Sequence, residues 1–160
     1  MTPVRRLGSD EWALLRDLRL AALRDAPHAF ASTHAREAGD TEDAWRERAG
    51  AHAWFVAEAG GEAVGLVAGA ARDGAAAHVL SMWVHPRHRG RGIGAALVAA
   101  VCDWAAARAA TQVTLWVADG NDAATRCYAR AGFVPTGRRQ PLPSDPAVGE
   151  ELWARTLPPR

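Results

Sequence analysis

The sequence of 160 residues has no lysine, because all 19 of its basic residues are arginines. This absence excludes Walker P-loop enzymes, which need a lysine on the phosphates, and pyridoxal enzymes, which need one for the Schiff base. No apolar run approaches the roughly 18 residues of a membrane span, and residues 1–10 lack the apolar segment of a secretory signal. We therefore expect a soluble, cytoplasmic protein with no membrane partner.

Cysteine and net charge are also scarce. Cys102 and Cys127 each fall in an expected helix, and we interpret them as small buried hydrophobic residues, with a catalytic or disulfide role as the alternative. The 19 basic and 18 acidic residues are spread along the chain and leave a net charge of +1. No field strong enough to steer the protein onto nucleic acid is expected.

What remains is the composition of one globular domain over residues 1–160, with 49% apolar and 23% charged residues. Apolar spacing and turn residues predict a helix capped by Ser9 or Asp10, a polar stretch at 32–40, a short helix at 41–49, a hairpin of 53–57 and 63–70, a strand at 78–84, a helix at 93–108, a strand at 113–117, a helix at 121–131, a proline-containing loop up to Pro146, and a strand at 151–157. This order predicts an α/β domain with a mixed sheet covered by helices.

The segment from Val84 to Ala95 leaves a strand and enters a helix with glycines at 90, 92 and 94. Glycine lets backbone N–H groups approach a ligand closely, and the first N–H groups of a helix have no partner of their own. Together with the helix dipole they favour a phosphate, to which the arginines at 87, 89 and 91 add screened attraction. The segment therefore predicts a phosphate-binding turn.

Three other interpretations of this segment are weaker. It could be only a tight connection with solvated arginines. Gly90, Gly92 and Ala95 also fit the dinucleotide pattern G-x-G-x-x-G/A, but no acidic residue lies near 20 positions later and only about 65 residues remain for the other strands of that fold. His85 and His88 have H-x-x-H spacing, yet a turn with no evident third ligand is a poor zinc site.

Two linked motifs resemble those of a known family. Arg89-Gly90-Arg91-Gly92-Ile93-Gly94 is similar to the Q/R-x-x-G-x-G/A signature of the GNAT superfamily of N-acetyltransferases, with Met82-Trp83-Val84 where that family has its central strand. The residues Asn121, Ala124, Tyr128, Gly132 and Phe133 resemble its N-x-x-A-x-x-x-Y-x-x-x-G-F segment. The resemblance covers roughly residues 78–136 and implies a single-domain GNAT-like fold with splayed central strands.

The resemblance also implies a reaction: an amine attacks acetyl-CoA directly in a ternary complex, without a metal. Tyr128 would be the catalytic acid that protonates the departing thiolate, and a backbone N–H near Val84 would polarise the thioester carbonyl. The implied cofactor-binding residues are Met82, Trp83 and Val84 for the pantetheine arm, Arg89, Gly90, Arg91, Gly92, Ile93, Gly94 and Ala95 for the pyrophosphate, and Asn121 near the pantetheine.

The general base is where the sequence departs from the family pattern. Many relatives carry a glutamate on one of the splayed strands, but 78–84 and 113–117 contain no carboxylate, and Trp116 occupies one such position. The candidates elsewhere are Glu37, Glu150, Glu151, His85 and Asp119, and an ordered-water relay is an equal alternative. A non-catalytic acyl-CoA sensor with the same fold is the rival interpretation.

The acceptor side carries less information. The resemblance places the acceptor between residues 29–45 and 140–148, whose mixed aromatic and acidic side chains suit a small amine, an amino acid, a peptide N-terminus or an antibiotic. The sequence selects none of these, and it leaves the oligomeric state open, a homodimer included.

Overall fold

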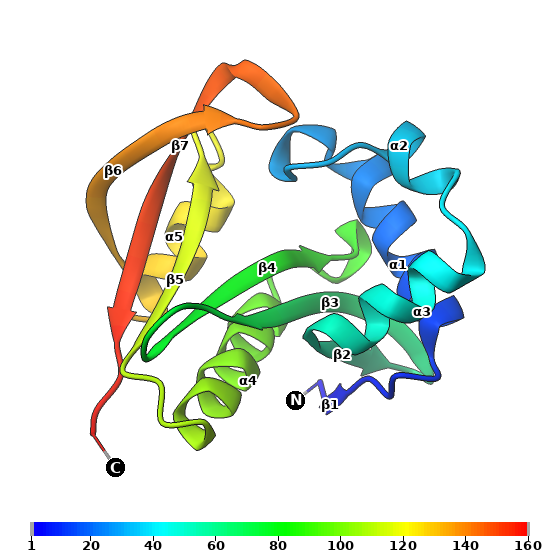
Figure 1. The fold of residues 1–160 in the computed structure, drawn as a ribbon, viewed down its shortest axis with the longest axis horizontal. Helices are drawn as coiled ribbons and strands as arrows, with labels where there is room; N and C mark the ends of the chain where they lie inside the picture. Colours follow the sequence, from blue (N-terminus) through cyan, green and yellow to red (C-terminus); the bar gives the residue numbers. More distant parts are fainter. Residues whose placement is uncertain (1, 160) are drawn as a thin grey trace.

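A seven-stranded mixed sheet forms the centre of the computed structural model, which describes residues 2–159 (Figure 1). The strands lie in the order β1-β2-β3-β4-β5-β7-β6, and only β4 and β5 are parallel. Their bounds are β1 Val4–Arg6, β2 Ala53–Ala59, β3 Glu62–Ala71, β4 Ala76–Val84, β5 Gln112–Ala118, β6 Val134–Leu142 and β7 Asp145–Thr156. The predicted α/β class with a mixed sheet is confirmed.

Helices cover both faces of this sheet, each over its own hydrophobic core. One face carries α4 (Ile93–Ala107) and α5 (Asp122–Arg130), and the other carries α1 (Trp12–Asp25), α2 (His34–Ala38) and α3 (Glu42–Ala51) (Figure 1). Two short 3-10 turns, η1 (Pro27–Ala29) and η2 (Pro86–His88), complete the described elements. Because apolar residues on both sides of β2, β3 and β4 are buried, this part of the sheet is a rigid support for the site.

Close packing of α4 on the sheet depends on a glycine in β3. A Cβ atom at Gly69 would lie 2.8 Å from two ring carbons of Trp104 in α4. The alanine-rich helix can therefore approach the strand closely, and a large indole fills the space that the missing side chain leaves. This contact sets the height of α4 above the sheet and thereby the position of its N-terminus.

The structure corrects three local predictions. The expected proline-containing loop is an antiparallel hairpin of β6 and β7, which is tolerated because Pro135 and Pro141 lie in the edge strand, where an N–H is not needed on the outer side. The three-residue β1 and the single-turn helix α2, capped by Thr33, were not expected. The N-cap of α1 is Glu11, without a side-chain cap bond, instead of Ser9 or Asp10.

The parallel strands β4 and β5 pair over only three residues and then separate. The last paired residues are His78 and Thr114. Three residues later Ser81 has a positive φ of 59°, and the register between β3 and β4 shifts between Leu66 and Ala68, so β4 carries a bulge. The strands therefore diverge toward their carboxyl ends and leave an opening in the middle of the sheet (Figure 1).

Candidate cofactor cleft and active site

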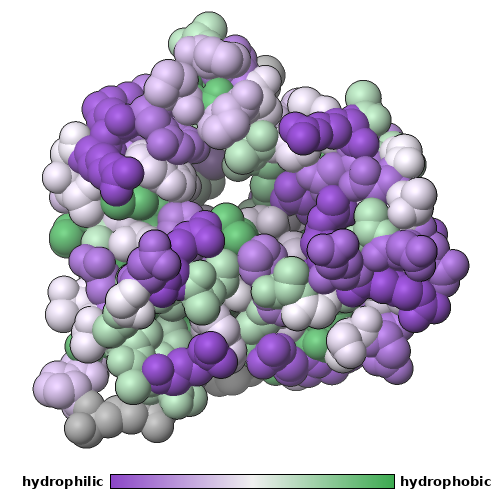
Figure 2. Space-filling model, viewed as in Figure 1, coloured by the Kyte–Doolittle hydropathy of each residue, from purple (hydrophilic) through white to green (hydrophobic). Residues whose placement is uncertain are grey.

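A cleft of about 580 Å³ occupies the opening between β4 and β5. Its walls are residues 79–84 of β4, residues 115–118 of β5, the N-terminus of α4, one face of α5, and Ala29 and Phe30 beside η1. The space-filling view shows the opening between the β6–β7 side of the molecule and the helical side (Figure 2). A long, thin molecule could therefore enter between the splayed strands.

The predicted phosphate turn lies at the mouth of this cleft. Gly90 and Gly92 have φ values of 76° and 81°, and Gly92 is the N-cap of α4. The first backbone bond of the helix runs from the Ala96 N–H to the Gly92 carbonyl, and the N–H groups of residues 92–95 donate to no acceptor within residues 2–159. Four unpartnered N–H groups at the positive end of a helix dipole form a site for an anion such as a pyrophosphate.

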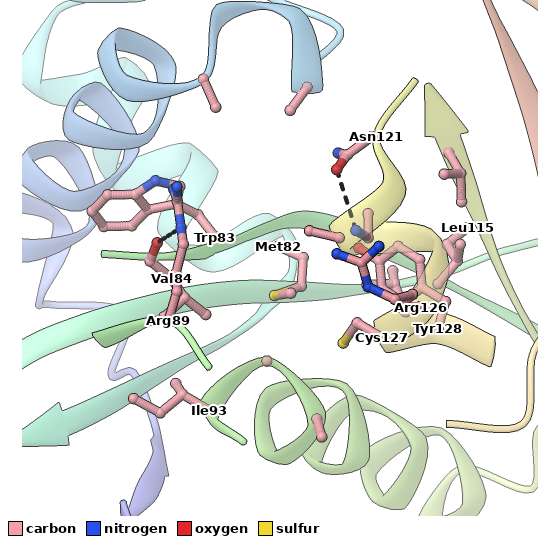
Figure 3. Close-up of a pocket in the computed structure, with 18 of the residues that line it drawn as sticks. Met82, Trp83, Val84, Arg89, Ile93, Leu115, Asn121, Arg126, Cys127 and Tyr128 are labelled. Atoms are coloured by element: carbon pink, nitrogen blue, oxygen red, sulfur yellow. Dashed lines mark hydrogen bonds between the residues drawn. The ribbon is translucent and has the colours of Figure 1, made fainter. Parts of the chain in front are cut away.

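Gly94 has a different role from the two turn glycines. Its backbone is helical, and a Cβ atom there would lie 3.0 Å from Cε of Met82 and 3.3 Å from Sγ of Cys127. The glycine therefore lets α4, β4 and α5 meet around the cleft, as the close-up shows (Figure 3). Cys127 is reduced and partly buried, and burial raises the pKa of its thiol, so it is a packing group here.

The arginines of the turn differ from the prediction that all of them attract phosphate. Arg89 lines the cleft, but its Nε donates to the Val84 carbonyl at 3.0 Å and its Nη2 pairs with Asp25 at 2.5 Å (Figure 3). Asp25 also accepts a bond from the Trp83 indole at 3.0 Å. Burial raises the pKa of Asp25, but the bonds from Trp83 and Arg89 outweigh it and leave the pKa below its ordinary value. Arg89 thus braces the end of β4 against α1.

Two other predicted cofactor residues, Arg91 and Trp83, are placed differently with respect to the cleft. Arg91 is exposed and lies outside the cleft lining. Trp83 is one of the lining residues, but it is only 5% exposed and packs in the core beneath α1. Arg126 and Arg130, which the sequence motifs did not indicate, line the cleft and have no acidic partner within residues 2–159. Their i, i+4 spacing on α5, following the cap residue Asn121, could have revealed them.

Asn121 and Tyr128 both line the cleft from α5, as their spacing predicts. Asn121 is the N-cap, and its Oδ1 accepts a bond from the Ala124 N–H at 3.2 Å (Figure 3). Tyr128 is 7% exposed, and its hydroxyl has no hydrogen-bond partner within residues 2–159. Burial raises the pKa of Tyr128 well above its ordinary value of 10, so the phenol stays protonated at neutral pH. It is therefore equipped to donate a proton and not to accept one.

All five candidate bases accept hydrogen bonds in the structure, and four of them accept from an arginine side chain or a backbone N–H. Glu37 is buried in a bidentate pair with Arg19, at 2.9 and 3.0 Å. Asp119 pairs with Arg139 at 2.5 Å, Glu151 accepts the Gly137 N–H at 3.1 Å, and the His85 Nδ1 accepts the Arg87 N–H at 3.1 Å. The fifth, Glu150, is buried and accepts only from the Gln140 amide, at 2.6 Å. No group of three His, Cys, Asp or Glu side chains in the described chain is arranged to hold a metal.

A model of the acetyltransferase (GNAT) family matches residues 15–133, which include the glycine turn, Asn121 and Tyr128. The chain belongs to the GNAT acetyltransferase family. It is 34% identical over 95 residues to an uncharacterised N-acetyltransferase of Methanocaldococcus jannaschii, in an alignment that covers 56% of this chain and 42% of that protein. The chain thus spans less than half the length of this curated relative.

Solved GNAT structures share the whole fold. A GNAT-family acetyltransferase from Streptococcus pneumoniae superposes with a TM-score of 0.78 at 18% identity, covering 99% of this chain and 100% of that one. The yncA protein of Salmonella typhimurium, solved with its cofactor acetyl-CoA, gives a TM-score of 0.76 at 19% identity, covering 100% and 96%. These likenesses confirm the GNAT fold. Within residues 2–159, no helix is long and apolar enough to cross a membrane.

Proposed function

We propose that this GNAT-family protein transfers the acetyl group of acetyl-CoA to a primary amine. The observation that carries the proposal is the anion site of residues 92–95 at the mouth of a cleft between two splayed strands, with a protonated, unpartnered Tyr128 in its wall. Phosphate binding alone would not need the cleft. The Tyr128 hydroxyl bonds to no other residue within 2–159 and lines the cleft, so it is free to donate a proton to a molecule bound there.

The cofactor would lie along β4. Past His78 this strand no longer pairs with β5, so an extended pantetheine arm can hydrogen-bond to its open edge in the manner of an added strand, beside Met82 and Val84. The N–H groups from Gly90 to Ala95 would hold the pyrophosphate. The guanidinium groups of Arg126 and Arg130 would supply the positive charge that Arg89 and Arg91 do not direct into the cleft.

The chemistry would be direct attack by the amine on the thioester carbonyl carbon. Tyr128 donates its proton to the thiolate sulfur as the C–S bond breaks, and a backbone N–H near Val84 stabilises the developing oxyanion. The amine must reach this carbon in its neutral form, since an ammonium nitrogen has no lone pair. A group on the acceptor side of the cleft must therefore remove a proton.

Acetyl-CoA binding and turnover test this proposal. CoA at 100 times its dissociation constant should stabilise the protein by about 2.7 kcal/mol, seen as a rise in melting temperature. Tyr128→Phe should slow thiol release with an amine by roughly 10² or more, while the CoA-induced melting shift stays unchanged. As a control for ring packing, Phe133→Leu, next to Tyr128 with ring centroids 6.1 Å apart, should lower stability with a much smaller effect on turnover. An unchanged rate for Tyr128→Phe would remove this residue from the mechanism.

A non-catalytic acyl-CoA sensor is the second candidate, favoured by the lack of a carboxylate on β4 and β5. It predicts the same melting shift with CoA but no thiol release with any amine. The unpartnered hydroxyl of Tyr128 favours the enzyme, because a sensor would have no use for a proton donor beside the thioester. If CoA gave no melting shift at all, both functions would be wrong.

A further inference from the structure

The strand β7, which neighbours β5, carries a carboxylate close to the opening. Glu150 pairs with Ala118 of β5, and Leu152, two residues later, pairs with Trp116. Directly paired residues of antiparallel strands project to the same face of a sheet. Val113, Leu115 and Val117 are buried in the core with α4, so Trp116 and Ala118 lie on the opposite face. Glu150 therefore lies on the face of the sheet opposite to α4.

This side of the cleft is closed by a contact between distant segments. The tip of the β6–β7 hairpin reaches toward η1, and the Ser144 hydroxyl donates to the Phe30 carbonyl at 2.5 Å (Figure 1). Phe30, Trp116 and Ala118 all line the cleft. Glu150 is not itself one of the lining residues, but it pairs with Ala118, which is, so its side chain lies next to this wall, across the opening from the strand that would hold the thioester.

Within residues 2–159, no cation pairs with the carboxylate of Glu150. On β6 the facing residue is the neutral Gln140, and on β5 it is Ala118. Arg139 pairs with Asp119 and Glu151. The side chains of Arg139 and Asp119 lie over Gly149, on the face of the strand opposite to the side chain of Glu150. Across the cleft, Arg19 is neutralised by Glu37. Burial raises the pKa of Glu150, and the bond from Gln140 lowers it only in part.

We propose that Glu150 binds the ammonium group of a cationic acceptor and is the general base of the transfer. The inference rests on the proposed acetyltransferase function. A buried carboxylate without a cation is costly, and an incoming ammonium supplies the missing partner. Glu150 pairs with no cation within residues 2–159 and lies on the acceptor side of the opening. It thus identifies both the acceptor's chemical class and the residue that activates it.

The protons and bonds balance as follows for a primary ammonium. One N–H proton passes to the Glu150 carboxylate, and the neutral nitrogen attacks the thioester carbon to form the C–N bond. The C–S bond breaks, and Tyr128 protonates the sulfur. The nitrogen then loses a second proton, which restores the Tyr128 phenol. Glu150 releases its proton to solvent, so the products are the acetylated amine, CoA with a free thiol, and one proton.

Glu150→Gln tests the assignment, with Glu151→Gln as the matched control, because Glu151 is the next residue but faces the other way and bonds to Gly137. The probe is the amine that the wild-type protein acetylates fastest among a polyamine, a free amino acid, a tripeptide and an aminoglycoside. An alkyl ammonium of pKa about 10 is neutral in only about one part in 10³ near pH 7. For such an amine kcat/KM should fall by about 10² to 10³ in Glu150→Gln and stay at the wild-type value in Glu151→Gln.

The pH profile separates a base from a merely structural residue. In Glu150→Gln, kcat/KM should rise about tenfold per pH unit above pH 7 and approach the wild-type value near the pKa of the amine, since the free amine then replaces the missing base. Glu150→Asp should restore part of the rate. The melting temperature of Glu150→Gln should rise above that of the wild type at pH 8, because a buried unpaired charge is removed, and the CoA-induced shift should be retained.

Two results would overturn the assignment, and a third concerns the proposed function. Wild-type activity in Glu150→Gln, or an equal loss at every pH, would show that Glu150 is not the base. If wild-type protein binds CoA but releases no thiol with any of the four amines, amine acetylation itself fails, and the role of Glu150 fails with it. If the wild type is active and Glu150→Gln has no effect, only the assignment of Glu150 as the general base is wrong.

Discussion

Replacing Glu37 by glutamine should cost far more stability than any surface charge change in this protein. Glu37 holds Arg19 by two bonds of 2.9 and 3.0 Å, and their side chains are only 6% and 11% exposed. Glutamine preserves the shape but leaves the Arg19 charge buried with too little compensation. Removing one partner of a buried pair costs about 3–5 kcal/mol, which for a domain of this size lowers Tm by roughly 6–20 °C.

The same substitution should reach the active site. The third nitrogen of Arg19 donates to the Ser81 hydroxyl at 2.8 Å, and Ser81 is the bulge residue of β4 with a positive φ of 59°. A non-glycine residue holds this conformation only when its surroundings fix it. Loosening Arg19 should therefore also lower kcat, since the bulge shapes the strand along which the thioester would lie.

Urea unfolding at pH 7 measures the stability effect, with Glu42→Gln as the control. Glu42 pairs with Arg46 at 2.9 Å, but both side chains are more than half exposed, so this change should cost less than about 0.5 kcal/mol. Replacing the buried pair together, Arg19→Met with Glu37→Leu, should recover most of the lost stability. A loss below about 1 kcal/mol for Glu37→Gln, with an unchanged m-value, would refute the reasoning.

Acid should act on the same pair. Burial raises the pKa of Glu37, but the bonds and charge of Arg19 outweigh it and leave the pKa below 4.5. A carboxylate whose pKa is lowered by folding contributes its full stabilisation at pH values above its pKa in the unfolded state. This stabilisation is lost as the pH falls through its pKa in the folded state. The wild-type protein should therefore lose this stabilisation below pH 4.5, and Glu37→Gln should lose less over the same range.

Two further predictions concern the phosphate turn and the buried His78. Gly92→Ala, at φ 81° in the phosphate turn, should weaken CoA binding and destabilise the protein by about 1–2 kcal/mol. The control Gly60→Ala, at φ 59° in the β2–β3 turn, should destabilise the protein without changing the CoA-induced melting shift. An equal loss of CoA binding in both variants would contradict this prediction. His78 is buried beside Thr114, and burial, aided by the charge of Arg72, lowers its pKa to about 4, so folding favours the neutral ring. The contribution of the neutral His78 ring to the free energy of unfolding should be complete above pH 6.5 and fall by up to about 3 kcal/mol between pH 6.5 and 4. His78→Gln should remove this pH dependence in urea unfolding. An NMR titration of the His78 imidazole near pH 6.5 would contradict the prediction.

Local chain chemistry carried much of the fold prediction. The helix of α4, the β2–β3 hairpin and the Asn121 cap were predicted because each depends on residues close in the sequence. The second half of β7 was predicted as a strand, but β6 and the start of β7 were predicted as a loop, because their prolines indicate irregular structure unless the strand is known to lie at a sheet edge. That position depends on pairing with β7, which no local pattern contains.

The sequence by itself predicted the phosphate turn, and only the tertiary structure decided the state of each candidate base. The phosphate turn is a continuous segment in which glycine conformation and an unpaired helix N-terminus do not depend on distant residues, so Gly90 to Ala95 could be recognised in advance. The state of each carboxylate depends on partners elsewhere in the chain. Glu37 pairs with Arg19, Asp119 pairs with Arg139, and Glu150 bonds to Gln140 with no cation beside it among the described residues. Burial and pairing of charges are properties of the folded arrangement, and only the fold distinguished these carboxylates.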